Sequence, residues 1–207
     1  MQIEQVNRNK LVEWILGVNA AFKARESKQI PYEPITIESV LKKNRTCFAC
    51  IDDEGIMVGG FSFAYDLRMH IVTIGNIWVM PEHQGKGISN CLVEYAEERA
   101  RELNATSIQL IVANIYKPAV NLYAKHGFAA VEVCANVPGT YYLIRMMKYL
   151  QPCGVIAKLK RNLVYYRSLL IFFFLYKPDS SPGFGYKIYK ILKSRQYDHC
   201  VENGGEL

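Results

Sequence analysis

Hydrophobic and polar residues alternate with two periods along the chain, and these predict helices and strands in a definite order. Apolar side chains recur at helical spacing in residues 7–25, and a short helix is expected over residues 34–44, with Thr36 as its N-cap. Residues 46–66 predict two strands joined by a turn at DDEG, and residues 70–80 predict a third strand.

The second half of the predicted fold begins with a polar loop, residues 81–90, and a long helix. We expect this helix to place one shared face in the core, formed by Cys91, Leu92, Tyr95, Ala96 and Leu103. An apolar strand over residues 106–114, a short helix over residues 117–127, and two closing strands over residues 129–135 and 141–150 follow. The order strand, helix, strand, helix, strand predicts an α/β sheet that contains a parallel step.

The character of the chain changes near residue 151, where QPCG interrupts the pattern. Residues 151–207 hold nine Lys or Arg and four Asp or Glu, a balance of +5, whereas residues 1–150 hold 16 and 15, a balance of +1. We therefore expect a domain over residues 1–150 and a basic, apolar, helical extension over residues 151–207. The extension is the part expected to meet an anionic partner.

Composition narrows the class of protein. The start of the chain, MQIEQVNRNK, lacks an apolar stretch, so we expect no secretory leader and a cytoplasmic location. No apolar run reaches the roughly 18 to 20 residues of a membrane-spanning helix. The six cysteines are then expected to be reduced thiols. Cys47 and Cys50 form a CxxC inside a predicted strand and lack a second pair, so we expect buried thiols rather than a redox or zinc site.

The loop PEHQGKGISN contains the candidate chemistry. Gly85 and Gly87 flank Lys86 where a strand gives way to a helix. The first N–H groups of a helix lack internal partners, and the helix dipole adds partial positive charge there. Such a turn holds a phosphate or pyrophosphate, although a glycine-softened turn without a ligand is an equally simple interpretation. The loop matches neither the Walker pattern nor the dinucleotide-binding G-x-G-x-x-G.

Two blocks resemble the GNAT superfamily of acetyl-CoA-dependent N-acetyltransferases. Residues 84–89, QGKGIS, resemble its acetyl-CoA loop, Q/R-x-x-G-x-G/A, with Ser89 where glycine or alanine is usual. Residues 113–128, ANIYKPAVNLYAKHGF, resemble its block N-x-x-x-x-A-x-x-L/F-Y-x-x-x-GF. The resemblance covers roughly residues 5–150 and leaves the extension outside.

The resemblance implies a mixed, mostly antiparallel sheet flanked by helices, with one pair of parallel strands splayed apart to admit acetyl-CoA. The splayed strands would be residues 74–79 and 107–114. Backbone groups of Ile77 and Val79 would pair with the pantetheine arm, and the Val79 N–H would polarise the thioester carbonyl. The pyrophosphate would lie on Gln84, Gly85, Lys86, Gly87, Ile88 and Ser89. Asn114 would bond the cofactor arm, and no metal is implied.

The same resemblance makes Tyr123 the acid that protonates the departing thiolate, so the implied catalytic residues are Tyr123 and Val79. Family members often carry a carboxylate on the strand before the loop, but residues 73–79 have none. Asn76 can orient a water without accepting its proton. Glu82, His83, Asp66 and His70 remain candidates for the general base, alongside a chain of water molecules.

The resulting hypothesis is an N-acetyltransferase that passes the acetyl group of acetyl-CoA directly to a primary amine of a small molecule, such as an amino sugar, an amino acid or an antibiotic-like amine. The alternatives are a catalytically weak acyl-CoA-binding or regulatory module and a protein N-acetyltransferase. A homodimer and a peripheral membrane contact through residues 155–195 stay open as further partners. Nucleic acid is not expected, because no recognisable nucleic-acid-binding fold accompanies the basic residues.

Overall fold

The structure, a computed structural model, describes residues 1–26, 32–42, 45–137, 141–151, 163 and 166–167. The described elements follow the order expected from the sequence, with one additional strand at the start and a short 3-10 turn after the fourth strand. They are β1 (Gln2–Gln5), α1 (Leu11–Lys23), α2 (Ile37–Lys42), β2 (Thr46–Ile51), β3 (Met57–Asp66), β4 (Ile71–Val79), η1 (Pro81–His83), α3 (Ile88–Glu102), β5 (Ser107–Ala113), α4 (Lys117–Lys125), β6 (Ala129–Val137) and β7 (Tyr141–Tyr149).

The strands form one seven-stranded sheet in the order β1-β2-β3-β4-β5-β7-β6. Only the pair β4 and β5 is parallel among the described strands, and all other neighbours are antiparallel. Helix α3 supplies the crossover between the two parallel strands, as a parallel connection requires. The predicted mixed, mostly antiparallel sheet with a parallel step is therefore confirmed.

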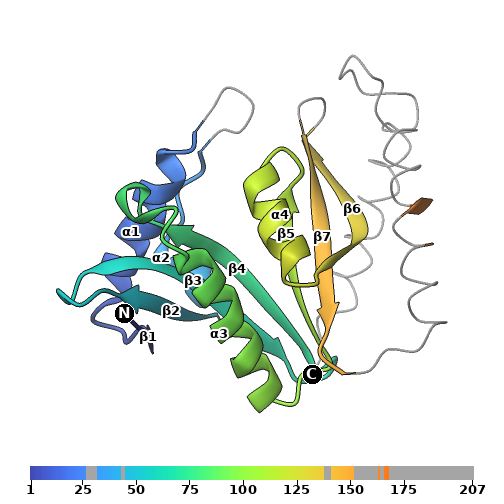
Figure 1. The fold of residues 1–207 in the computed structure, drawn as a ribbon, viewed down its shortest axis with the longest axis horizontal. Coiled ribbons are helices and arrows are strands. Elements are labelled where there is room, and N and C mark those ends of the chain that lie inside the picture. Colours follow the sequence, from blue (N-terminus) through green and yellow to red (C-terminus); the bar gives the residue numbers. More distant parts are fainter. Residues whose placement is uncertain (27–31, 43–44, 138–140, 152–162, 164–165, 168–207) are drawn as a thin grey trace, which may run out of the picture.

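Helices cover both faces of the sheet, and each face has its own core (Figure 1). One core packs α1 and α2 against the sheet and includes Trp14, Val18, Val40 and Trp78. The larger core packs α3 and α4 on the opposite face. A thirteen-residue helix such as α1 gains most of its stability from this packing of its apolar face rather than from helix propensity.

Glycines allow α1 and the sheet to approach closely. A Cβ on Gly17 would lie 2.4 Å from the Trp78 ring, and a Cβ on Gly60 would lie 2.4 Å from the Phe48 carbonyl oxygen. In the space that these glycines leave, the Trp14 indole N–H donates a 2.9 Å hydrogen bond to the Phe48 carbonyl. The Trp14 and Trp78 rings meet edge to face at 6.2 Å. The position of α1 is therefore fixed by tight contacts near the end of β4.

Three details differ from the sequence-based expectations. Strand β1 pairs with β2, although its few residues gave no strand pattern. Cys91 is exposed on α3, because the buried face is formed instead by Ile88, Leu92, Val93, Ala96 and Ala100. Leu103, predicted on that face, is the C-cap and stays 37% exposed, since the helix ends at Glu102.

Both cysteines of the CxxC are described by the structure, whereas little of the extension is. Cys47 and Cys50 are both buried free thiols, and they belong to the cores on opposite faces of the sheet. Burial raises the pKa of the Cys47 thiol to about 12, so it stays protonated. Almost all of the proposed membrane contact over residues 155–195 lies outside the described residues. Within the described part of the chain, no helix is long and apolar enough to cross a bilayer.

Candidate functional site

The parallel strands β4 and β5 separate part-way along their length. They pair only from Ile71 to Thr73 on β4 and from Ser107 to Gln109 on β5. The amide of Gln109 donates a 3.0 Å hydrogen bond to the Thr73 hydroxyl at the last paired position. Beyond it, β4 stays paired with β3 and β5 stays paired with β7, so the two halves of the sheet diverge (Figure 1). The predicted splay is therefore present.

Strand β4 contains a β-bulge beside this gap. The register between β3 and β4 shifts between the pairs Gly60–Trp78 and Ser62–Gly75, so β4 holds one more residue than β3 over this stretch. Asn76 takes up this bulge with a φ of 49°, a left-handed conformation that asparagine tolerates better than most residues. The pair Gly75-Asn76 within an otherwise apolar strand is a sequence signal for such a bulge, but the bulge was not predicted.

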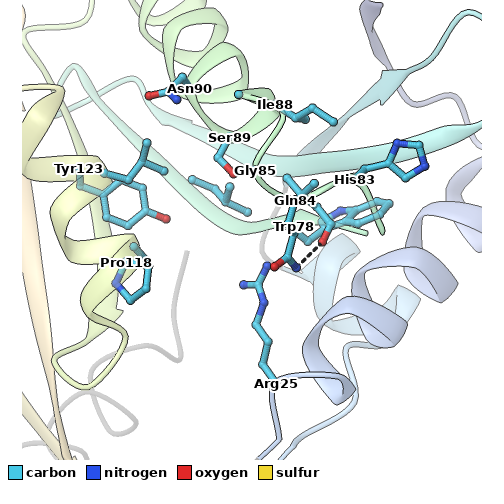
Figure 2. Close-up of a pocket in the computed structure, with 15 residues that line it drawn as sticks. Arg25, Trp78, His83, Gln84, Gly85, Ile88, Ser89, Asn90, Pro118 and Tyr123 are labelled. Atoms are coloured by element: carbon cyan, nitrogen blue, oxygen red, sulfur yellow. Dashed lines mark hydrogen bonds between the residues drawn. The ribbon is translucent and has the colours of Figure 1, made fainter. Parts of the chain in front are cut away.

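Beyond the bulge, backbone groups of β4 point into the gap. The Met80 N–H donates to the Val58 carbonyl at 2.9 Å, so it faces β3. Because successive backbone groups alternate sides along an extended strand, the Val79 N–H faces the opposite way, toward the gap. On that side the Gln84 amide donates to the Val79 carbonyl at 3.2 Å (Figure 2). Ile77, two residues earlier, lines both cavities.

The loop after β4 ends directly in helix α3. Gly85 and Gly87 adopt φ values of 77° and 82°, where side-chain-bearing residues are strained, and Gly87 is the N-cap of α3. No side chain caps this helix end. The first helical hydrogen bonds to the Gly87 carbonyl come from Asn90 and Cys91, which leaves the N–H groups of Ile88 and Ser89 unused within the helix. These two residues line a cavity, and their free donors suit an anion.

A first cavity of about 360 Å³ lies between this loop and α4 (Figure 2). Its lining includes most of the residues predicted to bind the cofactor, namely Ile77, Val79, Gln84, Gly85, Gly87, Ile88, Ser89 and Tyr123. Lys86 is exposed and lies outside the lining. Asn114 also lies outside it, because its side-chain oxygen accepts a 3.0 Å hydrogen bond from the Tyr142 N–H and so secures the end of β5 to β7.

Tyr123 reaches the first cavity from α4. Its ring is buried, packs edge to face with Phe128 at 6.1 Å, and directs its hydroxyl into the cavity (Figure 2). Burial raises the pKa of the Tyr123 phenol to about 12, while the Arg25 guanidinium acts in the opposite direction. The phenol is therefore a proton donor across the physiological pH range, and a weaker acid than free tyrosine.

A second cavity of about 590 Å³ adjoins the first one. Both cavities are lined by Arg25, Ile77, Gln84, Pro118, Ala119 and Tyr123. The second cavity adds Asn76 at the bulge and two carboxylates, Glu26 after α1 and Glu33 before α2. Sequence reasoning missed these carboxylates. No local pattern in the sequence marks them, because Glu26 and Glu33 join this lining only through the fold.

The structure shows which candidates for the general base line a cavity and which lie elsewhere. Asp66 and His70 lie at the turn between β3 and β4, where Asp66 is the register partner of Ile71, at the end of β4 remote from the loop. His83 lines the first cavity, and Glu82 is exposed on η1 outside both linings. The carboxylates that do line the second cavity are Glu26 and Glu33.

His126, at the end of α4, makes a side-chain hydrogen bond to helix α3. Its ring lies 3.0 Å from the Asn90 side-chain oxygen and so links the end of α4 to α3. This bond fixes the spacing of the two helices that bound the first cavity. The residue thus has a structural role behind the cavity.

Comparison with known proteins decides the family. A family model described as Acetyltransferase (GNAT) family matches residues 11–128, more than half of the chain. The chain belongs to this family. The predicted GNAT resemblance is thereby confirmed, and the splayed strands β4 and β5 and the loop before α3 lie within the matched residues of this GNAT protein.

The matches to curated relatives span only part of each relative, and the likeness to solved structures concerns the fold alone. Streptothricin acetyltransferase of Streptomyces lavendulae is 35% identical over 82 residues, which are 40% of this chain and 43% of that protein. YqkA of Bacillus subtilis is 28% identical over 60% of this chain and 36% of its own length. The chain thus spans less than half the length of the curated relatives it matches.

A solved structure shows that the GNAT fold extends over most of the described chain. The ribosomal-protein-S18-alanine N-acetyltransferase of Escherichia coli superposes with a TM-score of 0.61 at 20% identity, covering 74% of this chain and 96% of that one. The likeness concerns the arrangement of helices and strands. It confirms the GNAT fold class independently of the sequence blocks.

Proposed function

We propose that this protein is an acetyl-CoA-dependent N-acetyltransferase that transfers the acetyl group directly to a primary amine of a small molecule. The observation that carries the proposal is the splayed gap between β4 and β5, where two cavities meet at Ile77, Gln84 and Tyr123. A direct transfer needs two substrates to meet at one point. Two cavities that share these lining residues support such a meeting point.

The first cavity suits acetyl-CoA. The unused N–H groups of Ile88 and Ser89 and the dipole of the 15-residue helix α3 would hold the pyrophosphate. The Val79 N–H faces the gap, and Ile77 lines the same cavity, so the backbone of these two residues would pair with the amides of the pantetheine arm as a neighbouring strand does. Membership of the GNAT family supports the assignment.

The chemistry would take place at the junction of the cavities. The amine nitrogen attacks the thioester carbonyl carbon, the C–S bond then breaks, and the nitrogen loses one proton. The Val79 N–H would stabilise the negative charge that develops on the carbonyl oxygen. The Tyr123 hydroxyl would donate its proton to the departing thiolate and recover one from solvent, which balances the proton released by the amine.

The likeness to streptothricin acetyltransferase supports a small-molecule acceptor, and amino sugars, amino acids and antibiotic-like amines are the classes to test first. The second cavity, of about 590 Å³, has room for such a molecule. The absence of a carboxylate from β4 favours the rival function of an acyl-CoA-binding module without turnover.

The test is thiol release from acetyl-CoA across a panel of primary amines, with mass spectrometry of the products. The proposal expects an acetylated amine and one free coenzyme A for each turnover. Binding of acetyl-CoA without thiol release for any amine would favour the binding module. Acetylation of peptide N-termini alone would favour the protein N-acetyltransferase.

We further propose a cytoplasmic protein whose basic extension, over residues 155–195, contacts an anionic membrane surface, with a homodimer as the alternative use of the same segment. The support is the +5 balance and the apolar run within residues 151–207. Co-sedimentation with anionic vesicles at low and high salt tests this proposal. Retention in the supernatant at low salt would contradict it, and sedimentation velocity distinguishes the dimer.

A further inference from the structure

Three charged side chains line the second cavity, the guanidinium of Arg25 and the carboxylates of Glu26 and Glu33. Arg25 also lines the first cavity, so it belongs to the part of the wall where the cavities join. Glu26 and Glu33 line the second cavity and not the first. A ligand in the second cavity would therefore have a positive group at the junction and negative groups in the part that the first cavity does not share.

The Arg25 guanidinium is available to act on bound molecules. It extends from the end of α1 toward Gln84 (Figure 2). Its nearest described ring contact is Phe22, at 5.9 Å from the guanidinium carbon, and no carboxylate within the described ranges pairs with it. It is close enough to Tyr123 and Tyr116 to oppose the rise in pKa that burial causes in both phenols.

A positive charge at the junction disfavours an ammonium there. An amine that enters this end would lose its proton more readily, because a like charge destabilises the protonated form. The uncharged amine is the form that attacks a thioester. Arg25 would thus help the reacting amine to lose its proton beside β4, a strand that contains no carboxylate base. It would also repel a second cationic group from the same place.

The part of the second cavity that the first cavity does not share favours a cation. Glu26 and Glu33 are both exposed, and neither pairs with a lysine or arginine among the residues that the structure describes. Aromatic rings from Tyr32, Tyr116 and Tyr141 share the lining with them. Carboxylates beside aromatic faces attract an ammonium group by charge and by cation–π contact.

We infer that the acceptor is a diamine-type molecule, in which Glu26 and Glu33 hold a distal ammonium while the reacting amine lies at the junction beside Arg25. This inference rests on the proposed function, and it names Glu26 and Glu33 as the residues that select the substrate. The distal charge fixes the direction in which the acceptor enters. A monoamine with a neutral or negative far end lacks that anchor.

The test is calorimetry on the full chain saturated with coenzyme A, which cannot supply an acetyl group. Three ligands of equal length are compared: 1,5-diaminopentane, 5-aminopentan-1-ol and 5-aminopentanoate. We expect the diamine to bind about three- to tenfold more tightly than the amino alcohol, since each exposed ion pair contributes up to roughly fivefold. The amino acid should bind most weakly. The preference should shrink at high salt, because exposed charges are screened.

The matched variants are Glu26→Gln with Glu33→Gln, which keep side-chain size and remove the charge. The control is Glu54→Gln, an exposed residue in the turn between β2 and β3. The double variant should lose the preference for the diamine, and the control should keep it. Equal binding of diamine and amino alcohol, tightest binding of the amino acid, or an unchanged preference in the double variant would each overturn the inference.

The two proposals fail in different ways. If the diamine is preferred by charge but no amine releases thiol from acetyl-CoA, the acceptor assignment is supported as a binding site and acetyl transfer fails. If amines are acetylated without regard to a distal charge, acetyl transfer holds and the diamine inference is wrong.

Discussion

Substitution of Gly87 tests whether an anion lies on the loop before α3. Gly87 has a φ of 82° and is the N-cap of α3, and a Cβ there would meet no atom within 4 Å. Any side chain at this position is therefore strained without clashing. The left-handed backbone costs a residue with a Cβ about 1 to 2 kcal/mol, so Gly87→Ala, Gly87→Gln and Gly87→Glu should lose similar amounts of folding stability.

The three variants differ in what they place near the helix N-terminus. Alanine adds backbone strain alone, and glutamine adds strain and the bulk of a longer side chain. Glutamate adds the same strain and nearly the same bulk as glutamine, together with a negative charge. A carboxylate about 5 Å from one phosphate charge is repelled by about 0.8 kcal/mol in water and about 3 kcal/mol at an effective dielectric constant of 20. We therefore expect Gly87→Glu to bind acetyl-CoA about fourfold to 150-fold more weakly than Gly87→Gln.

The assay is calorimetric titration with acetyl-CoA, with urea unfolding of each variant to show that it is folded. The difference between glutamate and glutamine should narrow as salt is raised, because part of the repulsion is screened. Equal affinities for folded Gly87→Glu and Gly87→Gln would show that no phosphate lies on this loop. The assignment of the first cavity to acetyl-CoA would then be wrong.

Three further predictions follow from the same geometry. Tyr123→Phe should lower turnover roughly ten- to a thousandfold while acetyl-CoA affinity stays within a few-fold, and an unchanged rate where chemistry limits would make Tyr123 structural. Because burial raises the pKa of Tyr123 to about 12 and the acid must be protonated to act, the rate should climb with pH as the acceptor deprotonates, without a Tyr123-dependent fall up to about pH 10. A fall that vanishes in Tyr123→Phe would contradict this. Gly60→Ala should destabilise the fold by roughly 1 to 3 kcal/mol, because its Cβ would lie 2.4 Å from the Phe48 carbonyl and 2.7 Å from the Trp14 indole nitrogen. Urea unfolding followed by tryptophan fluorescence measures it, and an unchanged midpoint would refute it.

The sequence predicted the elements whose cause is local. Helices α1, α3 and α4 and strands β2 to β7 have clear periodicity, and Thr36 accepts the hydrogen bond from the Ser39 N–H that a capping residue should accept, at 3.1 Å. The positive φ values of Gly85 and Gly87 also follow from residue type. These features depend on neighbours within a few residues, and a single sequence contains that information.

The remaining features depend on contacts between distant segments. Strand β1 forms because it pairs with β2 at the edge of the sheet. Cys91 is exposed because α3 packs on the sheet through Leu92 and Val93 instead. The side-chain oxygen of Asn114 accepts a bond from the Tyr142 backbone, a contact that only the pairing of β5 with β7 creates. Arg25, Glu26 and Glu33 meet β4 only after the chain folds, so the second cavity had no local pattern.

Acetyl transfer by this protein is tested by one coupled measurement on the full chain: thiol release from acetyl-CoA in the presence of 1,5-diaminopentane, with mass spectrometry of the amine from the same reaction. We predict one free thiol for each acetylated amine, with a rate that falls in Tyr123→Phe. Tight binding of acetyl-CoA without thiol release or acetylated product from any primary amine would contradict it.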